Sequence, residues 1–333
     1  MSHPTCRILC VLAAAASVLS ATTGHAQSPA WKPERNVEIV VSAGPSGNQD
    51  LTARMIQNIW QEKKIVPSSI VVNKPGGGGA IAYSYVSQRA RDPHVLVMLA
   101  PTLFSARIMG QIKFQHSDFT PIATLFEEYI FVSVRADSPV KSGRDLIERL
   151  KTKPDALSLA IATSIGNHIH LGVALPMKAA GVNIGKMLVV PYKSSGESFN
   201  ALLGGHIDVA ASTFGTVLPH LEAGRVRVIG VSAPKRMGGS LATVPTWREQ
   251  GADAVFSSWR GIAGTKGISE AQVTYWEAAL AAMANTDEWK KDVEKNFRVP
   301  QFLNGRDSSK YWDAQYGEVE TALTDLGLKA LNK

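Results

Sequence analysis

Five loops rich in hydroxyl and glycine residues carry the groups of this sequence that could do chemistry. They read SAGPSGN (42–48), NKPGGGG (73–79), TSIGN (163–167), KSSG (193–196) and STFG (212–215), and each joins an apolar run to a helical pattern. Free backbone N–H groups at a helix N-terminus attract an anion, and neighbouring hydroxyl groups add donors. Any single loop of this kind also fits an ordinary helix cap or turn. Together the five loops predict the capture of an anion.

The first loop does not match a nucleotide-binding signature. A dinucleotide fingerprint needs G-x-G-x-x-G, whereas Ser42 stands where the first glycine is required, ahead of Gly44 and Gly47. The next apolar run ends on Asn73 and Lys74 instead of the acidic residue that would hold a ribose. The sequence also contains no G-x-x-x-x-G-K-[ST] motif. These observations argue against a nucleotide phosphate and leave a substrate carboxylate, or no ligand at all, as the alternatives for this loop.

Residue sets typical of hydrolases and metal sites are missing from the sequence. It has no G-x-S-x-G elbow, with Ser46 as the nearest approach, and no H-E-x-x-H or EF-hand motif. His168 and His170 could share a metal only on a strand, but they lie where a helix should begin, which favours capping or packing roles. We therefore predict no catalytic residue, metal or cofactor. An exported hydrolase or lyase remains the alternative, with His168 and Asp50 as its best acid–base pair.

The N-terminus has the form of a secretory signal. Residues 1–26 contain one charge, Arg7, followed by the apolar run ILCVLAAAASVLS and by small residues that end at Ala26. The run is too short to span a bilayer comfortably. The protein is therefore expected to be exported, and cleavage after about Ala26 would remove both Cys6 and Cys10. The mature chain would then have no disulfide, thiol nucleophile or cysteine–metal site.

The charge of the chain suits a small anionic ligand better than a nucleic acid. Without Arg7 there are 34 basic and 28 acidic residues, a net charge of +6. The basic residues are spread along the sequence without a Lys/Arg-rich run that has interleaved aromatics, so no nucleic acid is expected as a partner. A modest positive field favours small anions. No apolar stretch after residue 26 is long enough to cross a membrane.

The positions of the loops follow from an α/β organisation. About 300 residues suit two α/β lobes. Short apolar runs that alternate with helical patterns predict mainly parallel sheets, with ligands at the carboxyl ends of the strands. Segments near 128–132 and 256–261 are the predicted crossings between the lobes, and the chain from residue 269 onward is expected to be mostly helical. The predicted strands lie in the runs VEIVVSA, SIVVNK, HVLVMLA, LSLAIAT, MLVVPYK, HIDVAAS and VRVIGVSA.

The sequence resembles the solute-binding receptors of tripartite tricarboxylate transporters, also called Bug-type receptors. The resemblance covers most of residues 33–330, and its most specific segment is VPYKSSGESFNALLGGHIDV. Other matching segments are VVSAGPSGNQDLTAR, IVVNKPGGGGAIA, LPHLEAGRVRVIGVSAPKR and VPTWREQG. The wording GPSGN and the two histidines of SIGNHIH depart from the usual family pattern. These departures leave the identity of the ligand open.

The resemblance implies a periplasmic-binding-protein fold of type II-like form, with mixed, mostly parallel sheets flanked by helices and two crossover strands. Lobe 1 would comprise residues 27–129 and 257–333, and lobe 2 residues 130–256. Such a receptor closes over a small organic acid and passes it to integral membrane subunits of the transporter. It is expected to act as a monomer without a cofactor. A receptor that feeds a membrane sensor would look the same in this sequence.

The same resemblance, carried over by position, implies the binding residues. One ligand carboxylate would be held by neutral donors, without a need for an arginine partner. The candidates in the two facing loops and in the adjacent third loop are Ser42, Gly44, Ser46, Gly47, Asn48, Thr163, Ser164, Gly166, Asn167, His168, Ser194 and Ser195. Apart from what the resemblance implies, the far end of the cleft is expected to be lined by Thr102, Leu103, Phe104, Thr213, Phe214 and Trp259, with Lys193 as a second anion partner. Asp50 and Asp208 are expected to be structural acids near the site.

Overall fold

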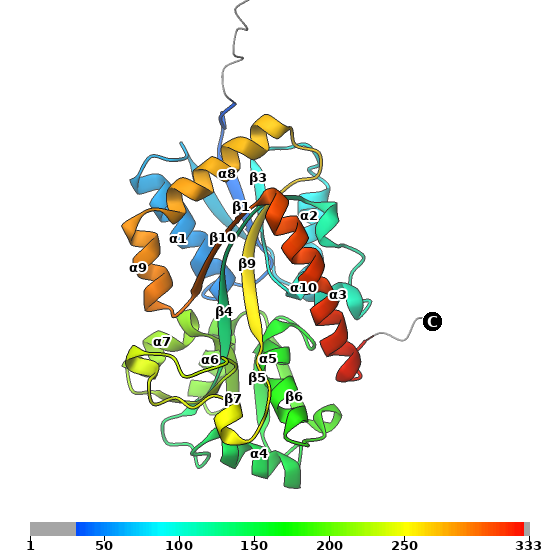
Figure 1. Cartoon of the computed structure of the whole chain (residues 1–333), viewed down its shortest axis with the longest axis vertical. Coiled ribbons are helices and arrows are strands. Elements are labelled where there is room, and N and C mark those ends of the chain that lie inside the picture. Colours follow the sequence, from blue (N-terminus) through cyan, green and yellow to red (C-terminus); the bar gives the residue numbers. More distant parts are fainter. Residues whose placement is uncertain (1–30, 330–333) are drawn as a thin grey trace, which may run out of the picture. The chain divides into compact units, whose positions relative to one another are not determined.

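The apolar runs of the sequence form short strands, and helices connect most of them (Figure 1). The structure, a computed structural model, describes residues 31–329, so the predicted signal peptide 1–26 lies outside the described residues. The strands are β1 (Val37–Val41), β2 (Ser69–Asn73), β3 (Val95–Leu99), β4 (Thr120–Arg135), β5 (Ser158–Ala162), β6 (Leu188–Tyr192), β7 (Val209–Thr213), β8 (Val226–Val231), β9 (Ser257–Gly264) and β10 (Val299–Asn304). The helices are α1 (Asn48–Glu62), α2 (Ala80–Ser87), α3 (Thr102–Ile108), α4 (Gly143–Thr152), α5 (His168–Ala179), α6 (Ser195–Leu203), α7 (Phe214–Glu222), α8 (Glu270–Ala284), α9 (Asp287–Lys295) and α10 (Gly305–Asp325).

The strands pair in the order β2-β1-β3-β9-β4-β7-β5-β6, and β8 and β10 also pair with β4. This confirms the predicted α/β class with mixed sheets flanked by helices. Among the described residues, four strand pairs are parallel and five are antiparallel. The expectation that parallel pairs would predominate is therefore wrong. The reason is that all five antiparallel pairs involve β4 or β9, which run against their neighbours.

Strand β4 changes partners in its middle. Its first part pairs with β9 as far as Tyr129, and from Ile130 onward it pairs with β7 and β8. Ser232 lies at this junction: its hydroxyl accepts from the Ile130 N–H at 2.9 Å and donates to the Phe256 carbonyl at 2.6 Å. One side chain thus connects the two segments that the sequence suggested as crossings.

Side-chain alternation along the strands supplies each sheet with two apolar faces. Val37, Ile39 and Val41 of β1 are buried with residues of α1, α8 and α9, whereas Val40 is buried with residues of α2, α3 and α10. In Figure 1 these two groups of helices lie on opposite sides of the upper sheet. A strand directs successive side chains to opposite faces, so a continuous apolar run is what a sheet covered on both sides requires.

The lower sheet follows the same rule. Ile130, Val132 and Val134 of β4 are buried with residues of α4 and α5, and Phe131 is buried with residues of α6 and α7. In chain order, β1 leads into α1, β5 into α5 and β6 into α6, so the loop after each of these strands ends at a helix N-terminus. The loop after β1 also touches the loop after β6, where the Gly44 N–H donates to the Lys193 carbonyl at 3.0 Å.

Two strand segments were not predicted. The sequence from residue 269 onward was expected to be mostly helical, but VPQFLN forms β10, which pairs antiparallel with β4. The first half of β4 was also missed, because the predicted crossing began near Glu128. Among residues 31–329, no helix has both the length and the apolarity that a membrane span needs.

Candidate functional site

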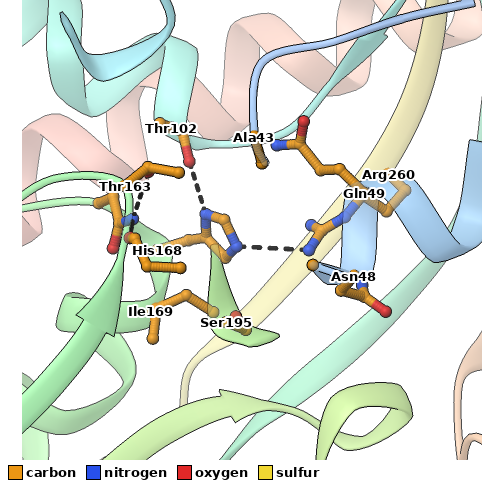
Figure 2. A pocket seen from close by; sticks show the side chains of 12 residues that line it. Ala43, Asn48, Gln49, Thr102, Thr163, His168, Ile169, Ser195 and Arg260 are labelled. Carbon is orange, nitrogen blue, oxygen red and sulfur yellow. Dashed lines mark hydrogen bonds between the residues drawn. The ribbon is translucent and has the colours of Figure 1, made fainter. Parts of the chain in front are cut away.

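A small cavity lies where the first helical turns after β1, β5 and β6 meet (Figure 2). It encloses about 20 Å³, room for about one water-sized group. Its lining residues are Ala43, Gly47, Asn48, Gln49, Thr102, Ala162, Thr163, Asn167, His168, Ile169, Ser195 and Arg260. Residues from loops and strands of both sheets therefore face the same cavity.

Three helix N-termini converge on this cavity. Asn48 and Gln49 are the first two residues of α1, His168 and Ile169 are the first two of α5, and Ser195 begins α6. The N–H groups of the first helical turn have no acceptor within their own helix, and the helix dipole makes this end electropositive. The cavity therefore has the form of an anion site.

Side-chain caps at two of these helices leave the first N–H groups for a ligand. The Asn167 side chain accepts from the His170 N–H at 3.0 Å, and the Ser194 hydroxyl accepts from the Glu197 N–H at 3.2 Å. In both helices the cap satisfies the third helical residue, so the first two N–H groups stay available. Gly47 caps α1 without a side chain.

Two residues of the cavity loops have left-handed backbone conformations. Ser46 has φ 62° and Thr163 has φ 66°, one in the loop after β1 and one in the loop after β5. Such conformations cost of order 1 kcal/mol or more for residues other than glycine, and they cluster at ligand sites. In these loops they accompany tight turns that direct the chain into α1 and α5.

A buried ion cluster adjoins the cavity. Arg260 on β9 is 1% exposed, and its Nη2 lies 2.7 Å from Oε1 of Glu128 on β4. Glu128 also accepts two hydrogen bonds from the Asn48 side chain, at 2.7 and 2.9 Å. A second arginine, Arg298, places its Nε 3.9 Å from Glu128 and pairs with Asp292. Burial lowers the pKa of Arg260, and the Glu128 charge opposes this shift, so the guanidinium remains charged.

His168 is neutral and has a defined tautomer. Burial, and then the positive charge of Arg260, lower the pKa of His168 well below its ordinary value. An arginine can only donate, so the 3.4 Å contact from Arg260 Nη2 makes His168 Nε2 the acceptor. The single ring proton is then on Nδ1 and is donated to Thr102 Oγ1 at 2.8 Å. Figure 2 shows both contacts across the cavity.

Residues 52–326 match the family described as "Tripartite tricarboxylate transporter family receptor". This match covers most of the chain. The protein belongs to this family. It is thus a solute-binding receptor, and the resemblance seen in the sequence is confirmed.

Relatives along nearly the whole length support this placement. A protein of Cupriavidus necator described as "UPF0065 protein in gbd 5'region" is 26% identical over 320 residues, which cover 95% of each chain. Protein BugT of Bordetella pertussis is 26% identical over 263 residues, covering 77% of this receptor and 79% of BugT.

Two solved structures show the same fold. Rpa4515 of R. palustris, solved with adipate, is 26% identical and has a TM-score of 0.82, covering 90% of the receptor and 99% of Rpa4515. The periplasmic binding protein BugD is 23% identical with a TM-score of 0.81, and the match covers 90% of the receptor and all of BugD (100%). The receptor therefore has the fold of periplasmic binding proteins.

Several residues suggested by the sequence come together in the receptor. Those that line the cavity are Gly47, Asn48, Thr102, Thr163, Asn167, His168 and Ser195. Others lie in the same loops without lining the cavity, namely Ser42, Gly44, Ser46, Ser164, Gly166 and Ser194. The loop residues have supporting contacts: the Ser42 hydroxyl donates to Gln49 Oε1 at 3.1 Å, and the Gly166 N–H donates to His170 Nδ1 at 3.0 Å.

Six proposed contacts lie away from the cavity. Trp259 is fully buried and stacks on Trp312 with ring centroids 5.1 Å apart, and Phe214 packs between Phe131 and Phe297. Thr213, Leu103 and Phe104 are also fully buried and lie outside the lining. The Lys193 side chain is exposed and does not line the cavity. The rings of Trp259, Phe214 and Phe104 serve the hydrophobic core in this structure, because burial in the core removes more of their apolar surface from water.

The two acidic residues differ in position. Asp50 lies in the first turn of α1, where it accepts from the Ser46 N–H at 2.9 Å and from Arg54 Nε at 3.0 Å. Burial raises the pKa of Asp50, but these bonds and one from Asn73 outweigh it, so the pKa falls below the ordinary value. Asp208 accepts from Ser158 and is exposed, in a separate depression at the starts of β5 and β7. Asp50 therefore supports the site loop, and Asp208 does not adjoin the cavity.

The pair required by the hydrolase or lyase alternative does not form. Asp50 is bonded to Arg54, Ser46 and Asn73, whereas His168 is bonded to Thr102 and Arg260. Within residues 31–329, no group of three or more His, Cys, Asp or Glu side chains is placed to hold a metal.

Sequence reasoning missed five lining residues, Ala43, Gln49, Ala162, Ile169 and Arg260. Arg260 is the most consequential, because the sequence suggested a carboxylate held without an arginine. Its position directly after Trp259 was a usable signal. Neighbouring residues on a strand face opposite sides, so if Trp259 packs into the core, Arg260 faces the other side of the strand. A charged residue within the apolar run SSWRGIAG indicates a buried ion pair or a ligand contact.

Proposed function

We propose that this receptor captures a small organic acid in the periplasm and delivers it to the integral membrane subunits of a tripartite transporter, without converting it. The observation that carries this proposal is the convergence of three helix N-termini on one cavity. Backbone N–H groups of α1, α5 and α6 can surround a carboxylate there. The adipate in the related Rpa4515 structure supports an organic acid as the ligand.

The capture is proposed to be a closure of two lobes, one of residues 27–129 and 257–333 and the other of residues 130–256. The change of partners on β4 between Tyr129 and Ile130 supports this boundary. The contact between Gly44 and Lys193 supports closure, because it joins the loop after β1 in one lobe to the loop after β6 in the other. A ligand that binds the closed form preferentially would shift the population toward it.

A thermal-shift screen of mono-, di- and tricarboxylates against the matching amides tests this function. We expect at least one acid to raise the melting temperature by roughly 5 °C at about 100 times its Kd, by mass action. The matching amide should have little effect, because it lacks the charge that helix N-termini favour. Equal stabilisation by acid and amide would contradict carboxylate capture. Proton NMR of the acid after incubation should show it unchanged, and reproducible turnover would contradict the receptor role.

A further inference from the structure

The guanidinium of Arg260 adjoins the ligand cavity with donor capacity to spare. Its Nη1 donates to the Ser258 hydroxyl and the Trp259 carbonyl at 3.0 and 2.8 Å, and its Nη2 lies 2.7 Å from Glu128. The remaining Nη2 contact, to His168, is 3.4 Å long and outside the usual range of a strong hydrogen bond. The Arg260 Nε is buried and has no acceptor among the described residues. A ligand oxygen in the cavity would improve this incomplete set of bonds.

Glu128, the anion that pairs with Arg260, does not itself face the cavity. It is absent from the cavity lining, and its two oxygens are occupied by Asn48 and Arg260. Arg298 adds a second positive charge to the same carboxylate. Arg260, Glu128 and Arg298 thus form a buried triad, and of these three only Arg260 lines the cavity. Asp292, which pairs with Arg298, lies at the partly exposed edge of this cluster.

Two further side chains around the cavity, Thr102 and Gln49, also have hydrogen-bond donors left for a ligand. Because His168 Nδ1 donates to Thr102 Oγ1, the Thr102 hydroxyl hydrogen is left for an acceptor in the cavity. Gln49 Oε1 accepts from Ser42, which leaves the amide N–H groups of Gln49 as donors. No Asp or Glu is among the lining residues. A ligand ammonium group would therefore meet donors and a positive charge.

We propose that Arg260 determines the specificity of the receptor: it receives a second anionic group of the ligand and rejects ligands that carry an ammonium group. This inference rests on the proposed function, in which the first carboxylate lies at the helix N-termini. The helix N-termini and Arg260 line the same cavity, so the two anionic groups of the ligand must lie close together, which favours a short ligand. The expected class is a short dicarboxylate without an amino substituent, in preference to its monoamide or its amino-acid counterpart.

Isothermal titration calorimetry with two matched ligand sets tests this specificity. The sets are succinate, succinamate and aspartate, and glutarate, glutaramate and glutamate. We expect the preferred diacid to bind at least about tenfold more tightly than its monoamide and its amino acid, because a charged hydrogen bond is lost in the monoamide and an ammonium group is added in the amino acid. If the monoamide or the amino acid bound within threefold of the diacid, the specificity proposal would be wrong while acid capture stood. If neither the two sets nor the wider acid screen gave binding, the proposed function itself would fail.

A double substitution separates ligand contact from structural support. Glu128→Gln with Arg260→Gln removes both charges together and so leaves no lone buried carboxylate at this pair. We expect its preference for the diacid over the monoamide to fall below about threefold, with cooperative unfolding retained. The control Lys235→Gln removes an exposed cation outside the cavity and should keep the wild-type preference. An unchanged preference in the double variant would assign Arg260 a structural role only and overturn the proposal. The wild-type selectivity decides the question independently if the variant does not fold.

Discussion

Replacing Glu128 by alanine should lower the free energy of unfolding by about 3–5 kcal/mol, because it leaves two buried arginines without their shared carboxylate. Glu128 is 2% exposed and is the only anion that Arg260 contacts among the described residues. Its loss would also free the Asn48 side chain, which donates to both carboxylate oxygens and begins α1 at the cavity. Urea unfolding followed by far-UV circular dichroism measures this change.

An exposed ion pair provides the matched control. Asp253 pairs with Arg248 at 2.8 Å, and their side chains are 87% and 50% exposed. Asp253→Ala should change the free energy of unfolding by less than about 1 kcal/mol, because water screens such pairs. If Glu128→Ala were as mild as this control, the buried triad would not support the fold as described.

Replacing Gly196 by valine should weaken ligand binding by about 10- to 100-fold while leaving the ligand-free protein close to its wild-type stability. A Cβ at Gly196 would lie 2.8 Å from the Ser46 Cβ, closer than real Cβ contacts allow, and a tight 3.0 Å from the Ser46 carbonyl oxygen. The overlap arises only where the loop after β1 meets the loop after β6. It should therefore disfavour the closed form by roughly 1–3 kcal/mol and reduce the apparent affinity accordingly.

Gly238 is a suitable control for this substitution. Its φ is −80°, and an added Cβ would have nothing within 4 Å. Gly238→Val should leave the Kd of the best acid unchanged, as measured by calorimetry. Equal affinities for the Gly196 and Gly238 variants would mean that the contact between the two loops has no part in binding.

Local sequence patterns were enough to predict the framework of the site. The apolar runs before residues 42, 163 and 193 became β1, β5 and β6, because strands covered on both faces need continuous apolar sequence. The glycine and hydroxyl residues that follow each run mark the turns into α1, α5 and α6. These signals depend only on neighbouring residues, so they could be interpreted without a structure.

The features that were missed depend on distant parts of the chain. Trp259 and Arg260 must face opposite sides of β9, but only the positions of β3, β4 and α10 decide which side is the core. Strand β10 is a short, partly exposed segment whose pairing with β4 brings together residues nearly 180 positions apart. Its alternation is too brief to distinguish it from a loop.

Backbone NMR of the 15N-labelled receptor tests the central claim most directly, with the acid that raises the melting temperature most as the titrant. If the helix N-termini hold the carboxylate, the amide protons of Asn48, Gln49, His168, Ile169 and Ser195 should move downfield and show the largest shifts. The matching amide at the same concentration should leave them nearly unchanged. Shifts confined to another surface, such as the apolar groove lined by Leu125, Trp289 and Phe302, would contradict the account.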